Sequence, residues 1–451
     1  MIRRFGSAPS RATECELSEP EEPGCSPYDG SFWLAHAANT LVAVAVGLNY
    51  RYADFVTFLG GSELHLGWIV GVGMVGSVLV RLGFGPGIDR NGPRGVWLGA
   101  LALLAVSSAA HLAIDRYDGS GIYLARIAFC TALAGVWSAS TTFIASRGPA
   151  ARMAELIGML GTSGFLGIMI GTQLGDWLCA DLNGRRQPVD RLFIASALLA
   201  LAAIPCVALA TRGGARLRHR HRVSVWTAVG QYQGVMALLL GVSAGAAISL
   251  PATFLRTYAA ELGIRRIGTF FTVSAIVALA SRLGARRVPE RLGLARMIVL
   301  GFAILAVAQF LYLPVQSEWH LVFPGAVVGM AQAILFPTIV AESSIPYPAQ
   351  YRGLAMTLIL AAFDVGQMLG APAAGAILHG SQAMGLPGYP ALFVVTAGML
   401  VAIAAIYAAH AWPRLRRPRY RLRGLDGQAT AAALQHTAVP AAGQSQSYPA
   451  A

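Results

Sequence analysis

The sequence predicts an all-α polytopic membrane protein with twelve transmembrane helices in two six-helix repeat halves. Composition is the first observation: 55% of the 451 residues are hydrophobic and only 12% are charged, whereas about a quarter of the residues of a soluble domain are charged. The second is a series of apolar runs of roughly 20 residues, each long enough to cross a hydrocarbon core as a helix. The third is a duplicated motif, which indicates a membrane protein built from repeats.

The apolar runs follow one another along almost the whole chain. They are rich in Gly and Ala, which allows helices to approach closely in lipid. Strands of a membrane barrel would instead alternate apolar and polar residues over segments of ~10 residues. The twelve expected spans are 32–56, 66–84, 95–113, 121–145, 153–175, 192–211, 228–255, 266–284, 294–314, 320–341, 353–378 and 390–412.

The duplicated motif combines an arginine with a following acidic turn. It begins with Arg81 in the first copy and with Arg282 in the second, 201 positions later. An acidic residue, Asp89 or Glu290, follows each arginine by eight positions. Each copy lies between two apolar runs, so we expect both copies on the same side of the membrane, at equivalent turns of the two halves.

Further similarity between the halves defines the expected organisation of the chain. The pattern Gly-x-Met-x-Gly at 167–171 recurs at 366–370, again about 200 positions later. The two halves therefore run in parallel, and such halves pack around an axis along the membrane normal with a solute site between them. The expected segments are an N-terminal tail (1–31), the N-terminal half (32–211), a basic linker (212–227), the C-terminal half (228–412) and a basic, then disordered, tail (413–451).

The net charge of +13 comes from arginines in the loops, since the chain has no lysine. With the N-terminus inside, the cytoplasmic segments hold 25 arginines and the outside segments hold eight. Positive residues are enriched in cytoplasmic loops, so we predict a multi-pass protein of the cell inner membrane with both termini in the cytoplasm. The same explanation removes the reason to expect a nucleic-acid partner.

The first copy of the motif resembles a family signature. Residues 85–94 read GPGIDRNGPR, which is similar to the loop Gly-x-x-x-Asp-Arg-x-Gly-x-Arg between the second and third spans of the major facilitator superfamily. The second copy departs from it, because Arg286 stands where the first copy has Gly85. The fourth span has an arginine, as the family does, but Phe129-Cys130 replace the Gln-Gly that follows it there.

The resemblance implies a secondary transporter that works by alternating access, with the acidic turns acting as conformational latches. In the family the loop acid bonds to neighbouring arginines and faces a helix N-terminus of the other half. A carboxylate is stabilised at such a position by the helix dipole. The latch residues implied here are Gly85, Asp89, Arg90, Gly92, Arg94, Glu290, Arg291 and Gly293.

Three arginines inside the spans are candidates for substrate contact or for a gate. Arg81 and Arg282 lie eight residues, or ~12 Å of helix, inside the bilayer from the acidic turns. They would be symmetry mates, and two facing guanidinium groups can clamp an anion. Arg126 in the fourth span is the deepest charge. An intramembrane arginine is costly and faces a cavity, a carboxylate or a backbone carbonyl, which leaves a gate role open as well.

A proton-coupled transporter needs a carboxylate or histidine whose protonation depends on its access to water. The candidates by position are Asp54, Asp364 and His36. A helix-capping or ion-paired acid remains the alternative interpretation for each carboxylate, and a satisfied polar residue remains the alternative for the histidine.

We therefore predict a monomeric, proton-coupled secondary transporter of a neutral or anionic organic solute or of an efflux substrate. The alternatives are a nitrate/nitrite- or carboxylate-type anion porter using Arg81 and Arg282, and a transporter-like membrane sensor. No phosphate-binding loop of the Gly-x-x-x-x-Gly-Lys-Ser/Thr type occurs. Neither a metal-ligand motif nor a catalytic constellation is found, so no enzyme activity, metal or cofactor is expected.

Overall fold

A computed structural model describes residues 28–83, 85–147, 152–180, 185–212, 234–284, 292–348 and 351–416. Within these ranges, eleven helices are long and apolar enough to cross a membrane, and a twelfth apolar helix, Gly268–Gly284, is shorter. The predicted all-α architecture with twelve membrane helices is thus confirmed.

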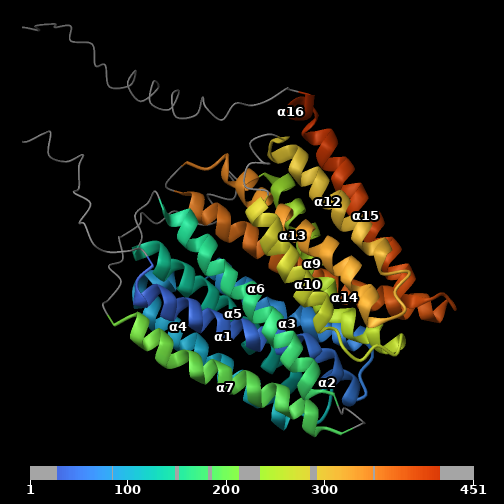
Figure 1. The fold of residues 1–451 in the computed structure, drawn as a ribbon, viewed down its shortest axis with the longest axis horizontal. Coiled ribbons are helices and arrows are strands. Elements are labelled where there is room, and N and C mark those ends of the chain that lie inside the picture. Colours follow the sequence, from blue (N-terminus) through green and yellow to red (C-terminus); the bar gives the residue numbers. More distant parts are fainter. Residues whose placement is uncertain are drawn as a thin grey trace, which may run out of the picture.

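Figure 1 shows how the membrane helices are arranged. The described elements are α1 (Gly30–Leu48), η1 (Asn49–Arg51), α2 (Tyr52–Phe58), α3 (Glu63–Gly83), α4 (Gly85–Ala110), η2 (His111–Ala113), α5 (Ser120–Arg147), α6 (Met153–Leu178), α7 (Gln187–Ala210), α9 (Val235–Glu261), α10 (Gly268–Gly284), α12 (Leu294–Leu311), η4 (Glu318–Leu321), α13 (Val322–Ser344), α14 (Arg352–Ala383), α15 (Gly388–His410) and α16 (Trp412–Arg416).

The helices gather into two halves, α1–α7 and α9–α15, which lie side by side in Figure 1, one blue to green and the other yellow to red. We call the end of the bundle where α7 ends and α9 begins the linker end. The opposite end, where α2 ends and α3 begins and where α9 ends and α10 begins, is called the distal end. The two halves meet mainly where α3 packs on α14 and α6 packs on α10.

The two turns of the duplicated motif share one backbone conformation. Gly92 has φ 71° and Gly293 has φ 80°, a left-handed region that glycine enters without the penalty of a Cβ. The next stretch of helix begins directly after each glycine, at Pro93 and Leu294. The repeat seen in the sequence is therefore also a repeat of local structure.

The first span differs from the continuous helix expected over 32–56. The helix α1 ends at Leu48, a single 3₁₀ turn follows at Asn49–Arg51, and α2 continues from Tyr52. The amide of Asn49 stabilises this break, since its Nδ2 donates to the carbonyl of Ala45 at 2.9 Å and to Oγ of Ser196 at 3.3 Å. Residues 51–56, at and after this break, are buried.

Glycines bring pairs of helices into close contact within each half. A Cβ on Gly171 of α6 would lie 2.2 Å from the carbonyl oxygen of Val44 on α1. A Cβ on Gly366 of α14 would lie 2.1 Å from the carbonyl oxygen of Val242 on α9. Small residues at such contacts let helix backbones approach in lipid. The α1–α6 and α9–α14 contacts are therefore equivalent in the two halves.

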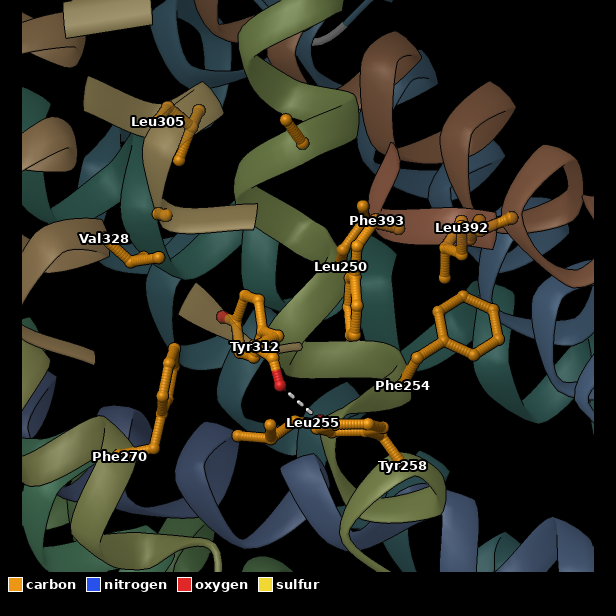
Figure 2. Packing of buried hydrophobic residues seen from close by; sticks show 14 of the residues in the cluster. Leu250, Phe254, Leu255, Tyr258, Phe270, Leu305, Tyr312, Val328, Leu392 and Phe393 are labelled. Atoms are coloured by element: carbon orange, nitrogen blue, oxygen red, sulfur yellow. Dashed lines mark hydrogen bonds between the residues drawn. The ribbon is translucent and has the colours of Figure 1, made fainter. Parts of the chain in front are cut away.

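Aromatic side chains fill the core of the C-terminal half near the distal end (Figure 2). The rings of Tyr312 and Phe393 stack with centroids 4.8 Å apart. The hydroxyl of Tyr258 donates to the carbonyl oxygen of Tyr312 at 2.6 Å, which fixes α9 against the end of α12. Phe270 of α10 packs on the same ring from the side of the other half.

Candidate functional site

A cavity of about 370 Å³ lies between the two halves. Side chains from α3, α5 and α6 line it on one side, and side chains from α9, α10 and α14 line it on the other. Its charged lining residues are Arg81, Arg126 and Asp364. A pocket of this size, mostly apolar with a few charged and polar groups, has the character of a small-molecule site.

Arg81 and Asp364 join the two halves at the cavity. Nε of Arg81 on α3 donates to Oδ2 of Asp364 on α14 at 2.5 Å. The hydroxyl of Ser77, one turn earlier on α3, donates to the same oxygen. Both charged side chains are largely buried, with 13% and 12% of their surface exposed. The structure thus brings together a predicted gate residue and a predicted proton-coupling residue.

In the described part of the chain, no carboxylate pairs with the symmetry mate of Arg81, Arg282. Phe165 lies 199 positions before Asp364, which is the offset of the repeated glycines in the same two helices. The guanidinium carbon of Arg282 lies 4.8 Å from the centre of the Phe165 ring, and its buried Nε has no hydrogen-bond partner among the described residues. The C-terminal half therefore places a carboxylate, Asp364, against an arginine of the N-terminal half. At the equivalent position the N-terminal half places an aromatic ring, Phe165, against an arginine of the C-terminal half.

Arg126 on α5 enters the cavity through a space that a glycine leaves open. A Cβ on Gly73 of α3 would lie 2.5 Å from Cγ of Arg126. The guanidinium carbon lies 4.4 Å from the centre of the Tyr52 ring and 5.3 Å from that of Phe129. Its Nη1 donates to Oδ1 of Asn49 at 3.5 Å, and among the described residues no carboxylate pairs with it.

Asp54 lies in a buried charge network at the distal end. It accepts from Nε of Arg51 at 2.7 Å and from Nε of Arg256 at 2.8 Å. Arg51 belongs to the N-terminal half and Arg256 to α9, so the carboxylate bridges the halves. The side chains of Arg51 and Asp54 are 2% and 7% exposed.

Asp176, near the end of α6, extends this network to α10. Its Oδ1 accepts from Nη1 of Arg51 at 2.7 Å. Its Oδ2 accepts from the backbone N–H of Ile267 at 2.9 Å and of Gly268 at 2.6 Å. Because Gly268 is the first residue of α10, the carboxylate neutralises the positive end of that helix. The distal end is closed by charged groups that satisfy one another.

His36 lies apart from both sites. Its Nε2 is 3.1 Å from Oγ1 of Thr162 on α6, and its ring packs edge-on against Trp33. The three proton-coupling candidates therefore occupy three places: Asp364 beside the cavity, Asp54 in the distal network and His36 between α1 and α6.

Part of the predicted latch falls outside the described residues. This applies to the side chains of Asp89 and Arg90, to the surroundings of Gly85, and to Glu290 and Arg291.

Arg94, the last arginine of the predicted latch, makes its hydrogen bond within its own half. Nη1 of Arg94 donates to the carbonyl oxygen of Thr211 at the end of α7, at 3.4 Å. In the C-terminal half Nη2 of Arg296 donates to the carbonyl oxygen of Leu415 at 2.8 Å. Each half thus ties the start of its third membrane helix to the chain that follows its sixth, at Thr211 or in α16 (Trp412–Arg416).

The helix ends at the linker end carry a further polar contact. The hydroxyl of Tyr28 donates to Oε1 of Glu155 at 2.6 Å, and Nε of Arg152 lies 3.2 Å from Oε2 of the same carboxylate. The hydrogen bond to Glu155 raises the pKa of Tyr28. This contact ties the chain before α1 to the start of α6.

Sequence reasoning did not identify the distal network. Arg51 and Arg256 counted only as outside arginines, and Asp176 was not singled out. A signal was present, because Arg51 and Asp54 are three residues apart in an apolar span and Asp176 directly follows the expected span 153–175. Buried charges in a membrane protein are paired, so these residues required partners.

Comparison with known proteins gives a family match. The family model described as Major Facilitator Superfamily matches residues 30–341 and 236–442. The chain is 25% identical over 408 residues to the multidrug resistance protein MdtG of Citrobacter koseri, covering 86% of this chain and 94% of that protein. It is 27% identical over 177 residues to the staphylopine export protein of Staphylococcus aureus, a match that spans only 38% of this chain and 42% of that protein.

Solved structures share the fold. The nucleoside transporter NupG superposes with a TM-score of 0.66 at 14% identity, covering 85% of this chain and 99% of that chain. The POT family transporter PepTSo superposes with a TM-score of 0.66 at 10% identity, covering 88% and 100%. Together with the family match along most of the chain, the twelve helices in two halves show that this protein belongs to the Major Facilitator Superfamily of membrane transporters.

Proposed function

We propose that the protein is a monomeric secondary active transporter, which moves a small organic solute by alternating access and couples this movement to protons. The observation that supports this most directly is the cavity between the halves, beside which a buried ion pair joins α3 to α14. Residues 32–211 and 228–412 would move as two bodies, and the segment 212–227 would connect them.

The proposed orientation places the linker end and both termini in the cytoplasm, in the inner membrane. The distribution of arginines supports it. Among the described residues, the hydrogen bonds between the halves lie from Arg81 toward the distal end, where Asp54 and Asp176 bridge the halves. In this orientation the structure corresponds to a state that is closed toward the outside. The acidic turns at Asp89 and Glu290 would stabilise the opposite state.

Asp364 is the proton-coupling residue that we favour over Asp54 and His36. It lines the cavity and holds Arg81 of the other half. A protonated Asp364 would no longer attract Arg81 as a carboxylate does, so taking up a proton would weaken the contact between α3 and α14. Proton binding and movement of the halves would then be linked.

The relatives do not indicate a single solute. Their names refer to multiple drugs, staphylopine, tartrate and a nucleoside. For an anion porter built on Arg81 and Arg282, the favourable observation is that Arg282 has no carboxylate partner among the described residues. Arg81 is already held by Asp364, so this alternative would require that ion pair to break first.

The test is solute-dependent proton movement in liposomes that contain the purified protein and a pH-sensitive dye. Organic anions, sugars and hydrophobic drugs are added one at a time, with and without a pH gradient. We expect at least one solute to move protons with the wild type. Asp364→Asn should abolish this response at unchanged protein abundance. The matched control is Asp118→Asn, because Asp118 lies in an exposed loop and pairs only with Arg116 among the described residues.

The outcomes separate the parts of the proposal. If no solute moves in the wild type while the protein is folded and reconstituted, transport is rejected and a sensor role gains support. If Asp364→Asn retains the proton response, the coupling assignment is wrong, and the same substitution at Asp54 becomes the next variant to measure.

A further inference from the structure

We propose that the cavity binds an organic monoanion, with Arg126 as its anion-binding residue and the surrounding rings as the surface for its apolar part. This inference rests on the proposed transport function and names the substrate class. It differs from the clamp of Arg81 and Arg282, because it places the anion on a third arginine.

Arg126 is the cavity arginine that has no carboxylate partner among the described residues. A guanidinium group has five N–H donors, and the described structure uses one of them, in the 3.5 Å contact of Nη1 with Asn49. Nε is buried and has no hydrogen-bond partner among the residues that the structure describes. The rings of Tyr52 and Phe129 hold the group in place. A carboxylate that enters the cavity would supply the acceptor oxygens, and a forked pair with arginine is strong and directional.

The charges of the cavity favour an anion that carries one charge. Its lining has two guanidinium groups and one carboxylate. The carboxylate of Asp364 is committed to Arg81, so the charge of Arg126 is uncompensated. The symmetry-related position does not compensate it, since it holds Phe165 instead of an acid. Desolvating an unpaired charge is costly, and a monoanion next to Arg126 would remove that cost.

The side chains that line the cavity indicate the chemistry of the rest of the ligand, beyond its anionic group. Aromatic rings line both sides of the cavity, and Tyr50 of η1 meets Phe271 of α10 with ring centroids 4.6 Å apart. Trp137 and Phe363 add further apolar surface. A volume of about 370 Å³ lies at the lower end of the range for small-molecule sites. Small aryl or alkyl carboxylic acids match this combination of an unpaired guanidinium group and aromatic walls.

The test measures binding without transport. Phenylacetate, phenylacetamide and phenethylamine share one ring and differ in charge, and each is titrated against the full-length protein in detergent by thermal shift. We expect phenylacetate to raise the melting temperature more than the other two probes, because a ligand stabilises the state it binds. Arg126→Gln should weaken the apparent affinity for phenylacetate by about tenfold or more.

Two further variants complete the design. Arg126→Lys keeps the charge but loses the fork, so its affinity for phenylacetate should fall between those of the wild type and Arg126→Gln. Arg116→Gln removes the same charge from an exposed loop, where the side chain is 78% exposed, and should bind as the wild type does. If Arg126→Gln does not fold, the inference is tested by the ranking of the three probes by their melting-temperature shifts, measured on the wild type and on Arg126→Lys.

An equal response to the three probes, including no response to any of them, would overturn the inference. The same holds if phenylacetate binds equally well to the wild type and to Arg126→Gln. Failure of the proposed function is seen separately in liposomes. If acids bind but are not transported, the proposed transport function is contradicted and the binding inference stands. If neutral drugs are transported without any preference for acids, the binding inference is contradicted and the transport function stands.

Discussion

Gly171 shows how a single missing side chain determines the packing of a whole helix pair. Its Cα faces the backbone of α1, and a Cβ there would lie 2.2 Å from the carbonyl oxygen of Val44. Gly161, ten residues earlier on the same helix, has nothing within 4 Å of its Cβ position among the described atoms. The two glycines therefore lie on the same helix, but only Gly171 is packed against a neighbouring backbone.

We predict opposite effects of alanine at these two positions. Gly171→Ala should lower the free energy of unfolding by about 1–3 kcal/mol, since overpacking forces the backbones apart. Gly161→Ala should leave stability unchanged or raise it by up to ~1 kcal/mol, because alanine favours a helix. Thermal unfolding of both variants in detergent measures the difference. Equal melting temperatures would show that the α1–α6 contact is looser than the structure indicates.

Single residues also show where prediction from the sequence stops. Arg81 and Asp364 could both be identified as membrane-embedded charges, but they are 283 positions apart. Their pairing depends on α3 packing against α14, which no local pattern encodes. Arg126 was predicted as a substrate or gate residue. Phe129 lies three residues later on the same helix, as helix periodicity requires, whereas the contact with Tyr52, at the start of α2 beyond the break in the first span, is seen only in the structure.

At the scale of elements, the distal network holds α2, α6, α9 and α10 together through charges. We predict that Asp54→Asn lowers the free energy of unfolding by about 3–5 kcal/mol, the cost of leaving one partner of a buried ion pair uncompensated. Arg256 would lose the carboxylate that it binds, and Arg51 would keep only Asp176.

Thermal unfolding in detergent tests this prediction, with Asp118→Asn as the control. The ion pair of Asp118 with Arg116 is exposed and should contribute little. An equally small loss for Asp54→Asn would mean that water or lipid compensates the two arginines, and that the network is not a structural lock.

The helices themselves were largely predictable, and their ends less so. Apolar runs located all twelve spans, because their length is set by the membrane. The break at Asn49–Arg51 was not predicted. It depends on bonds to Ser196 in α7 and to Asp176 in α6, and such bonds exist only in the folded bundle. The helix α7 begins at Gln187, five residues before the expected 192, with Pro188 in its first turn.

At the scale of the molecule, alternating access requires the distal contact between α6 and α10 to open. Nε2 of Gln173 donates to Oγ1 of Thr272 across that contact at 2.9 Å. In a variant without the five native cysteines, we introduce Gln173→Cys and Thr272→Cys. We predict that a reducible bifunctional thiol reagent stops solute transport and that reduction restores it. Flux in liposomes is the measurement.

The control is a pair within one half, Thr257→Cys and Tyr389→Cys. The hydroxyls of the native residues are 2.5 Å apart and link α9 to α15. Cross-linking them should leave transport intact, because these helices would move together. Transport that continues with α6 and α10 cross-linked would argue against rocking of the halves.

The two-half architecture could be predicted because both copies of the motif remain in the sequence. Their glycines adopt the same left-handed conformation in the structure. The asymmetry between the halves was less accessible: Asp364 and Phe165 occupy equivalent places, yet only the structure shows that each lies against an arginine. Similarity between repeats predicts architecture, while the differences between them define the chemistry of the site.

Arg51 has a consequence for how the distal end opens. One guanidinium group binds Asp54, which also holds α9, and Asp176, which also holds the start of α10. Withdrawing Asp176 lets water reach Arg51, and a charge pair is weaker in water than in a buried network, so the next contact is lost at a lower cost. The hydrogen bonds and ion pairs of the distal network therefore break cooperatively and not one at a time. The distal network should open in an all-or-none step, with no populated state in which only one of its helices has come away.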